Sequence, residues 1–136
     1  MTDINAVITA AASGMRAQTT RMRLAAENVA NASSTGTSPN EEPFRRRIPL
    51  LESTTLASGA EGVRVLGSTL DMSAFREEYN PSHPAADADG YVRLPNVDTL
   101  VEMMDMRDAQ RAYEANLNMI EAARGMTSRA LELLRK

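Results

Sequence analysis

The sequence contains no cysteine and no tryptophan, and it has only two phenylalanines, three tyrosines and one histidine among 136 residues. Without cysteine the chain forms neither disulfides nor thiolate metal sites. Because aromatic side chains are so few, alanine, methionine and leucine must supply most of the apolar surface. This composition favours thin seams between helices over a thick globular core.

The sequence also lacks a strong net charge and any long apolar run. A net charge of −3 gives no general attraction to nucleic acid. No apolar run approaches the roughly 20 residues that span a bilayer. The opening "MTDINAVITAAASGM" has neither the basic start nor the apolar core of a secretory signal. We therefore expect no nucleic-acid partner, no membrane insertion and no cleaved signal peptide.

The first third of the chain has the pattern of a long helix. Apolar or small residues recur in alternating steps of four and three, which is the heptad pattern of a coiled-coil seam and predicts a helix of about 28 residues. The positions are Ile4, Ile8, Ala11, Met15, Gln18, Met22, Ala25, Val29 and Ala32. A glycine inside a helix costs about 1 kcal/mol relative to alanine. Gly14 is therefore either a tolerated defect or a place where another helix comes close.

The last third predicts a second and longer helix. Pro95 precedes it, Asn96 or Asp98 is its cap, and it runs to about Leu134. It carries two apolar stripes, which are more than one partner helix can cover. The first stripe is Met103, Met106, Gln110, Tyr113, Leu117, Ile120, Thr127, Leu131 and Leu134. The second is Ala112, Ala115, Met119, Ala122, Met126, Ala130 and Leu133.

The middle of the chain has turn and strand signals. Residues 31–43 are rich in serine, threonine and proline, whereas 44–53, 61–72 and 91–95 have the β-branched or alternating apolar residues of short strands. The predicted fold is mainly α with a small β-rich insertion, and the long N- and C-terminal helices pair as an antiparallel coiled coil. We expect an N-terminal helical arm at 1–35, a linker and β-rich insertion at 36–95 and a C-terminal helical arm at 96–136. The two arms form one helical rod domain, in which pairing of the ends and equal rise on both helices put Gly14 roughly opposite Ala115.

The stretch "HPAADADGYV" at 83–92 has the look of a calcium-binding loop. Aligning Gly90 with the loop glycine puts Ala85 and Asn96 at the two end positions, where calcium loops need an oxygen ligand and a bidentate glutamate. Both end ligands are missing, and a single histidine without cysteine does not make a zinc site. We expect no metal here. Pro81 and Pro84 favour an extended path, with Asp87, Asp89 and Gly90 as turn residues.

No pattern points to catalysis or to a bound cofactor. With one histidine a Ser-His-Asp arrangement is implausible, and no glycine-rich phosphate loop occurs. The run "FRRR" at 44–47 lacks the broad basic surface and stacking aromatics of a nucleic-acid site, so a solvated or salt-bridged strand is the expectation. We therefore expect a protein that is not an enzyme.

Two segments resemble a known family. "ASGMRAQTTRMRLAAENVANASS" at 12–34 is similar to the N-terminal motif of bacterial flagellar axial proteins, the rod and hook subunits. "YNPSHPAADADGYVRLPNVD" at 79–98 and the helix after it also resemble this family. The resemblance departs from the family pattern after Asn31, where a serine- and threonine-rich linker follows, and at Arg107, Asp108 and Gln110.

The resemblance implies a structural subunit of the proximal rod that assembles helically and transmits motor torque across the periplasm. It implies export by the flagellar type III apparatus without a cleaved signal, with the terminal helices inward and the insertion outward. The implied partners are further copies of the chain and other rod proteins, including the rod–MS ring junction protein and distal rod subunits. The rival hypothesis is a free-standing helical adaptor that binds one partner helix.

Sequence and resemblance together give a set of candidate residues. Asn116 lies near an apolar stripe, and it is either a buried amide that fixes helix register or a solvated side chain. The assembly candidates are Gly14, Met15, Gln18, Met22, Asn28, Asn31, Tyr113, Asn116, Leu117, Ile120 and Met126. The candidates for a hinge between insertion and second helix are Pro84, Asp87, Asp89 and Gly90.

Overall fold

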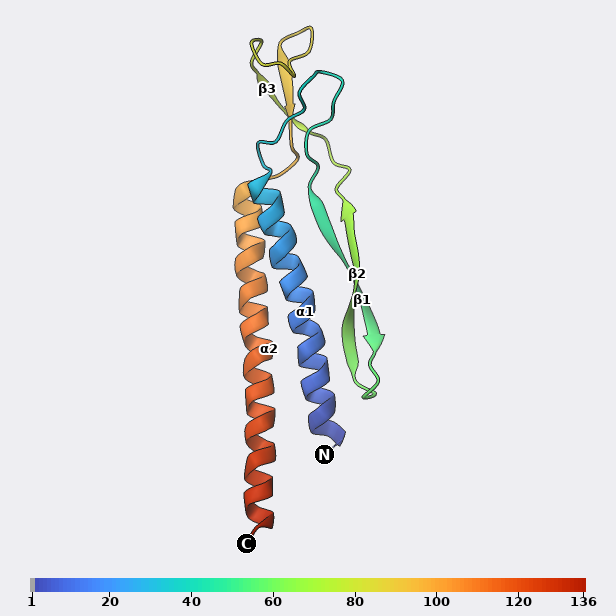
Figure 1. Cartoon of the computed structure of the whole chain (residues 1–136), viewed down its shortest axis with the longest axis vertical. Coiled ribbons are helices and arrows are strands. Elements are labelled where there is room, and N and C mark those ends of the chain that lie inside the picture. The colour runs from blue at the N-terminus through green and yellow to red at the C-terminus, as the bar shows by residue number, and fades with distance from the viewer. Residues whose placement is uncertain (1) are drawn as a thin grey trace.

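The computed structural model describes residues 2–136, which form two helices and four strands (Figure 1). The two helices hold about half of the chain, so a mainly α fold with a small β insertion is confirmed. In chain order the elements are α1 (Thr2–Ala30), β1 (Arg47–Thr55), β2 (Glu61–Leu70), β3 (Arg76–Tyr79), β4 (Tyr91–Leu94) and α2 (Thr99–Leu134).

The helices α1 and α2 lie side by side and run in opposite directions (Figure 1). At 1.5 Å per residue, α1 is about 44 Å long and α2 about 54 Å long. Asp98 caps α2, because its carboxylate accepts hydrogen bonds from the amides of Leu100 and Val101 at 3.0 and 3.4 Å. Within residues 2–136, neither helix is long and apolar enough to cross a membrane.

The strands β1 and β2 form an antiparallel hairpin that lies along α1 (Figure 1). The register shifts by one residue between Leu50 and Leu51, opposite Gly67, whose φ of 126° lies in the region that glycine tolerates best. Both predicted strands exist, but β1 begins at Arg47 and not at Phe44. Most strand residues of the hairpin are exposed on both faces.

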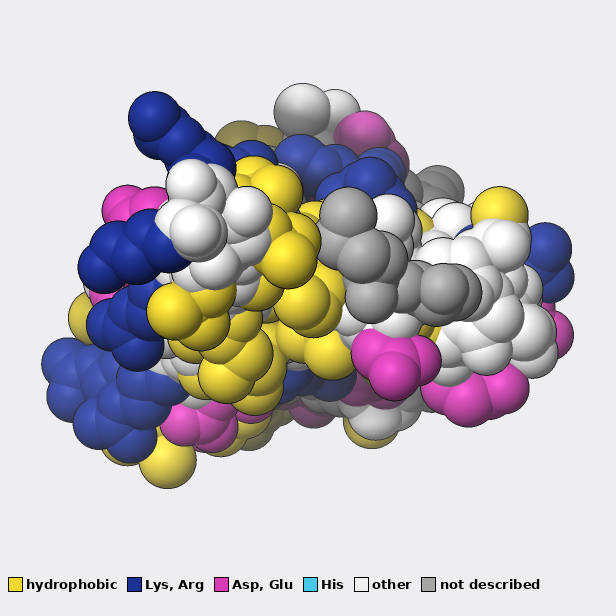
Figure 2. Space-filling model, turned by 90° about the horizontal axis from the view of Figure 1, so that it is seen from below, with side chains coloured by type: hydrophobic (Ala, Val, Ile, Leu, Met, Phe, Trp, Pro, Cys, Tyr) yellow, Lys and Arg dark blue, Asp and Glu magenta, His cyan; other side chains and the backbone are white. Residues whose placement is uncertain are grey.

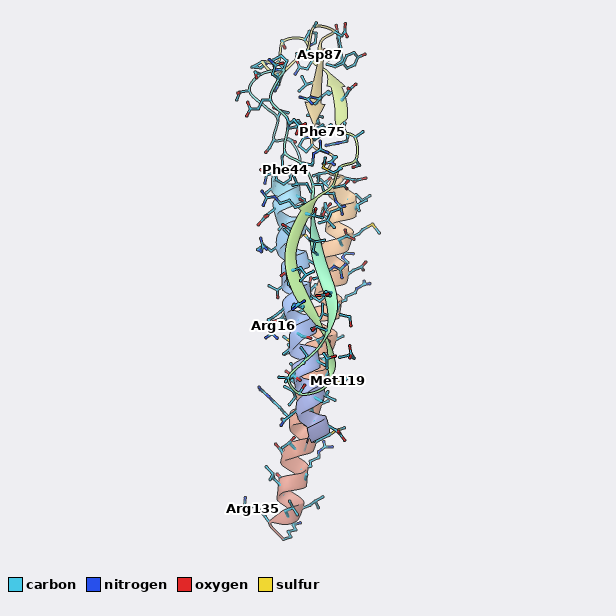
Figure 3. All side chains as sticks on the ribbon, turned by 90° about the vertical axis from the view of Figure 1, so that its right-hand side faces the viewer. Arg16, Phe44, Phe75, Asp87, Met119 and Arg135 are labelled. Atoms are coloured by element: carbon cyan, nitrogen blue, oxygen red, sulfur yellow. The ribbon has the colours of Figure 1, made fainter. Side chains whose placement is uncertain are left out.

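A second small sheet lies beyond the end of α1 and the start of α2 (Figure 1). Its strands β3 and β4 pair antiparallel from Arg76 opposite Leu94 to Tyr79 opposite Tyr91. The strand β4 was predicted, whereas β3 was not. The rings of Tyr79 and Tyr91 meet edge to face with centroids 5.4 Å apart. Figure 3 shows Asp87 at this end of the molecule and Arg135 at the other.

The interior is thin and built mainly from small side chains. Apart from Leu24, Val92 and Val97, the buried hydrophobic residues are all alanines, located mostly in the two helices: Ala11, Ala17, Ala25, Ala32, Ala85, Ala109 and Ala123. Small side chains let two helices approach closely but bury little apolar area. Much of the larger apolar surface therefore stays outside.

Candidate assembly interface

The seam between the helices is centred on Gly14 and Asn116. A Cβ atom at Gly14 would lie 2.7 Å from the Asn116 side-chain nitrogen, which is closer than a side chain tolerates without moving. Gly14 therefore faces Asn116 and not Ala115, which is exposed. The predicted pairing lies one residue from the observed one, and one residue turns a helix by about 100°, so the facing side chain is an amide and not a methyl group.

The line of α2 that faces α1 runs between the two predicted stripes. Its buried residues are Glu102, Ala109 and Ala123, separated by multiples of seven. From the first predicted stripe, Tyr113 and Ile120 border this line and are half-buried, whereas Leu117 is exposed. Because one helix covers only this central line, both flanks of α2 keep apolar side chains on the surface.

One flank of α2 carries an exposed apolar row that we call the methionine stripe. Its members recur with the period of a helix seam: Met119, Ala122, Met126, Ala130 and Leu133. The exposed fractions are 53% for Met119, 63% for Met126 and 76% for Leu133. Met119 and Met126 border a groove of about 220 Å³ with Ile4 and Val7 of α1. Figure 2 shows hydrophobic side chains gathered over the ends of the helices, with Lys and Arg beside them.

A second, open groove of about 670 Å³ brings three predicted residues together. Met15 of α1 and Tyr113 and Ile120 of α2 line it, together with residues of α1 and Val65 of β2. Met22 lies half-buried farther along α1. The side chain of Gln18 is hydrogen-bonded within its own helix, because its oxygen accepts from Arg21 at 2.9 Å.

The two asparagines of the N-terminal motif make contacts inside the molecule. Asn28 is 1% exposed and pairs with the backbone of Arg47, accepting from its N–H and donating to its C=O, both at 2.9 Å. Asn31 donates to the Glu27 carbonyl at 2.9 Å, and its side-chain oxygen accepts from Ser34 at 3.1 Å. Both side chains thus hold the end of α1 and the start of the insertion.

The residues predicted as a hinge form a compact turn. One carboxylate oxygen of Asp87 accepts from the amides of Asp89 at 3.0 Å and Tyr91 at 2.9 Å. Gly90 has a φ of 88°, and a Cβ there would lie 2.8 Å from the Tyr79 ring. The predicted extended path was wrong. Hydrogen bonds of the turn type close residues 80–83, 83–86 and 87–90, while Pro84 stays on the surface. Within residues 2–136, no three acidic or histidine side chains converge as metal ligands.

Sequence reasoning missed a cluster that we call the Arg46 junction: Arg46, Asp71, Glu102 and Asp105. The Arg46 guanidinium binds Glu102, and it reaches Asp71 at 3.3 Å and Asp105 at 3.5 Å. Glu102 is 2% exposed and also accepts from Asn28 at 3.2 Å. Neither "FRRR" nor "EMMD" indicates this contact, because its members come from three distant parts of the chain.

Burial and hydrogen bonding oppose each other in the Arg46 junction. Burial alone would lower the pKa of Arg46, but the hydrogen bonds and charges of Glu102 and Asp71 outweigh it and raise that pKa. The pKa of Asp71 lies below its ordinary value, chiefly because the amide and hydroxyl of Ser73 hydrogen-bond to its carboxylate and Arg46 lies beside it. Both groups are therefore held in their charged forms.

Comparison with known proteins identifies the family. The flagellar basal-body rod protein FlgC of Agrobacterium fabrum is 42% identical over 136 residues, which span 99% of this chain and 98% of the relative. The chain belongs to the FlgC family. The FlgC proteins of Bacillus subtilis and Aquifex aeolicus are 38% and 37% identical, and these matches span 90% and 97% of this chain and 92% and 98% of the relatives.

A family model described as the flagellar basal body rod FlgEFG protein C-terminal matches residues 88–133. This segment of the FlgC-family chain includes Gly90, strand β4 and almost all of α2. It therefore contains the methionine stripe and the α2 side of the seam. FlgC-family relatives are named as components of the flagellar basal-body rod.

Proposed function

We propose that this protein is a structural, non-enzymatic subunit of the flagellar basal-body rod, which assembles helically and transmits motor torque across the periplasm. The observation that carries the proposal is the methionine stripe, whose large side chains Met119, Met126 and Leu133 each remain more than half exposed within residues 2–136. Exposed apolar surface of this kind marks an interface. A subunit whose helices carry more apolar surface than they bury is suited to assembly.

The two grooves support an open assembly. The groove at Met119 and the groove at Met15 and Tyr113 are lined by different residues, so the subunit offers two unlike surfaces to its neighbours. Contacts between unlike surfaces do not close on themselves as twofold dimers do, and they extend into helical arrays. The occupants that we propose are further copies of this chain and other rod proteins, including the rod–MS ring junction protein and distal rod subunits.

The division of the chain follows from this role. The arms at 1–35 and 96–136 form one rod domain that pairs as an antiparallel coiled coil, and the part at 36–95 is an insertion on its outer side. Export occurs through the flagellar type III apparatus without a cleaved signal. Leu117 and Met126 are then assembly residues that meet neighbouring subunits, whereas Gly14 and Asn116 serve assembly by setting the seam within each subunit. The asparagines of the N-terminal motif act indirectly, Asn28 by holding the start of β1 and Asn31 by holding the turn after α1.

Neighbouring substitutions on α2 test this function. Met119→Glu places a charge in the methionine stripe, whereas Asn118→Glu places the same charge one residue away, on the polar side of the helix. We expect Met119→Glu to be exported but missing from isolated basal bodies, with swimming in soft agar lost, because burying an unpaired carboxylate is costly. Asn118→Glu should be incorporated and swim. Normal incorporation of Met119→Glu would contradict the proposal.

A further inference from the structure

The β1–β2 hairpin packs along α1 but makes few hydrogen bonds to it between the Asn28–Arg47 pair and the turn. Along its length, the Ser13 hydroxyl accepts a hydrogen bond from the amide of Val63 at 3.1 Å. Near its turn, the hydroxyls of Thr9 and Ser58 lie 2.6 Å apart. A two-stranded hairpin alone is at best marginally stable in water. Its position beside α1 therefore depends on packing against α1 and on the contacts at its base, where β1 begins and β2 ends.

The base of the hairpin, where β1 begins at Arg47 and β2 ends at Leu70, lies beside the Arg46 junction. The backbone of Arg46 is held on both sides, because its carbonyl accepts from the amide of Asp71 at 2.8 Å and its N–H donates to the side-chain oxygen of Asn96 at 2.8 Å. The side chain of the same arginine reaches the first turns of α2 at Glu102 and Asp105. One residue thus joins both ends of the hairpin to the helix pair.

We propose that the Arg46 junction is a conformational latch that fixes the direction of the hairpin relative to the helix pair. Arg46 is the positioning residue, and Asn28 of α1 binds the next residue, Arg47, at which β1 begins. This inference goes beyond the proposed function and does not depend on it, because it concerns the geometry of a single chain. When the ion pairs of Arg46 are formed, the hairpin and the helix pair form one continuous surface. When these ion pairs are broken, the hairpin moves independently of the helix pair.

The charges explain why Arg46 closes the latch. Three carboxylates face this one guanidinium, so removing it leaves an uncompensated buried Glu102 with Asp71 and Asp105 nearby. The strands themselves keep their backbone pairing from Arg47 to Thr55. Loss of Arg46 should therefore release the hairpin as a unit without melting it.

Distances between pairs of spin labels test the latch on the full chain. Labels at Ala57, near the turn of the hairpin, and Asp108, on α2, report the hairpin position, whereas labels at Asn5 and Asp108 report the helix pair. In the wild-type sequence both distance distributions should be narrow. In Arg46→Met the first distribution should broaden toward longer distances and the second should stay narrow. Arg64→Met removes an exposed ion pair with Glu52 on the same hairpin and should change neither.

A double variant separates the latch from a role in stability alone. Arg46→Met/Glu102→Gln no longer has the unpaired buried charge, so its melting temperature should rise above that of Arg46→Met. The hairpin distribution should nevertheless remain broad, because the arginine that joins the elements is still missing. The proposal is overturned if the hairpin distribution narrows together with recovered stability. It is also overturned if Arg46→Met leaves the first distribution narrow or broadens both equally.

Discussion

Replacing Gly14 by alanine tests whether this glycine exists for the helix seam. Alanine is better than glycine in a helix interior by about 1 kcal/mol. The new Cβ would lie 2.7 Å from Nδ2 and 3.2 Å from Cγ of Asn116, so that side chain must move. Forcing it off its rotamer costs about 0.5–1.5 kcal/mol. The gain and the cost nearly cancel, and Gly14→Ala alone should change the unfolding free energy little.

The two terms separate in a double-mutant cycle. In an Asn116→Ala background the obstacle is gone, so Gly14→Ala should stabilise by the full helix-propensity term of about 1 kcal/mol. For a chain of this size that raises the melting temperature by about 3 °C. The coupling energy between the two sites, measured by thermal unfolding of all four proteins, should be about 0.5–1.5 kcal/mol.

Gly125 on the same helix pair supplies the matched control. A Cβ added there meets nothing within 4 Å, so Gly125→Ala should stabilise by about 1 kcal/mol in either background. If Gly14→Ala is as stabilising as Gly125→Ala, with no dependence on Asn116, the close approach is not the reason for the glycine. The alternative, a tolerated defect, then holds.

Local signals in the sequence predicted the elements that depend on neighbouring residues. The choice of Asn96 or Asp98 as the cap, of which Asp98 is the one observed, and the end of α2 near Leu134 follow from residues within a few positions of each boundary. The hairpin strands follow from alternating apolar residues and the glycines between them. By contrast, β3 is the charged run "REEY", and it is a strand because β4 lies beside it. A single-strand pattern does not contain that information.

In the candidate site, too, features set by neighbouring residues were predicted and features set by distant partners were not. The periodicity predicted two apolar stripes on α2, and members of both lie exposed on its flanks. The register between the helices was predicted to within one residue, because pairing the arm ends at equal rise fixes it only approximately. The Arg46 junction was missed because its charges pair across 25 to 59 positions, and a sequence pattern gives charges without their partners.

Two further predictions concern the β-rich part of the chain. Gly90→Val should lower the free energy of unfolding by about 1–3 kcal/mol relative to the wild-type chain, because a β-branched residue strains a positive φ. Gly59 has a similar φ with nothing near its Cβ, so urea unfolding of Gly59→Val measures the backbone strain alone. Equal losses in the two variants would show that the contact with Tyr79 adds nothing. The second prediction is a pH dependence at Asp71, whose pKa is lowered mainly by the hydrogen bonds from Ser73. Since the folded state favours the ionised carboxylate, its contribution is complete above the unfolded pKa of about 3.9 and is lost as the pH falls through the lower folded value. Urea midpoints measured from neutral pH into this acid range should therefore fall less steeply for Asp71→Asn than for the wild-type chain, because asparagine has no proton to bind there. If the urea midpoints of the two proteins fall equally steeply with pH in the acid range, this carboxylate binds protons equally in the folded and unfolded states. Its hydrogen bonds then do not stabilise the turn at Ser73.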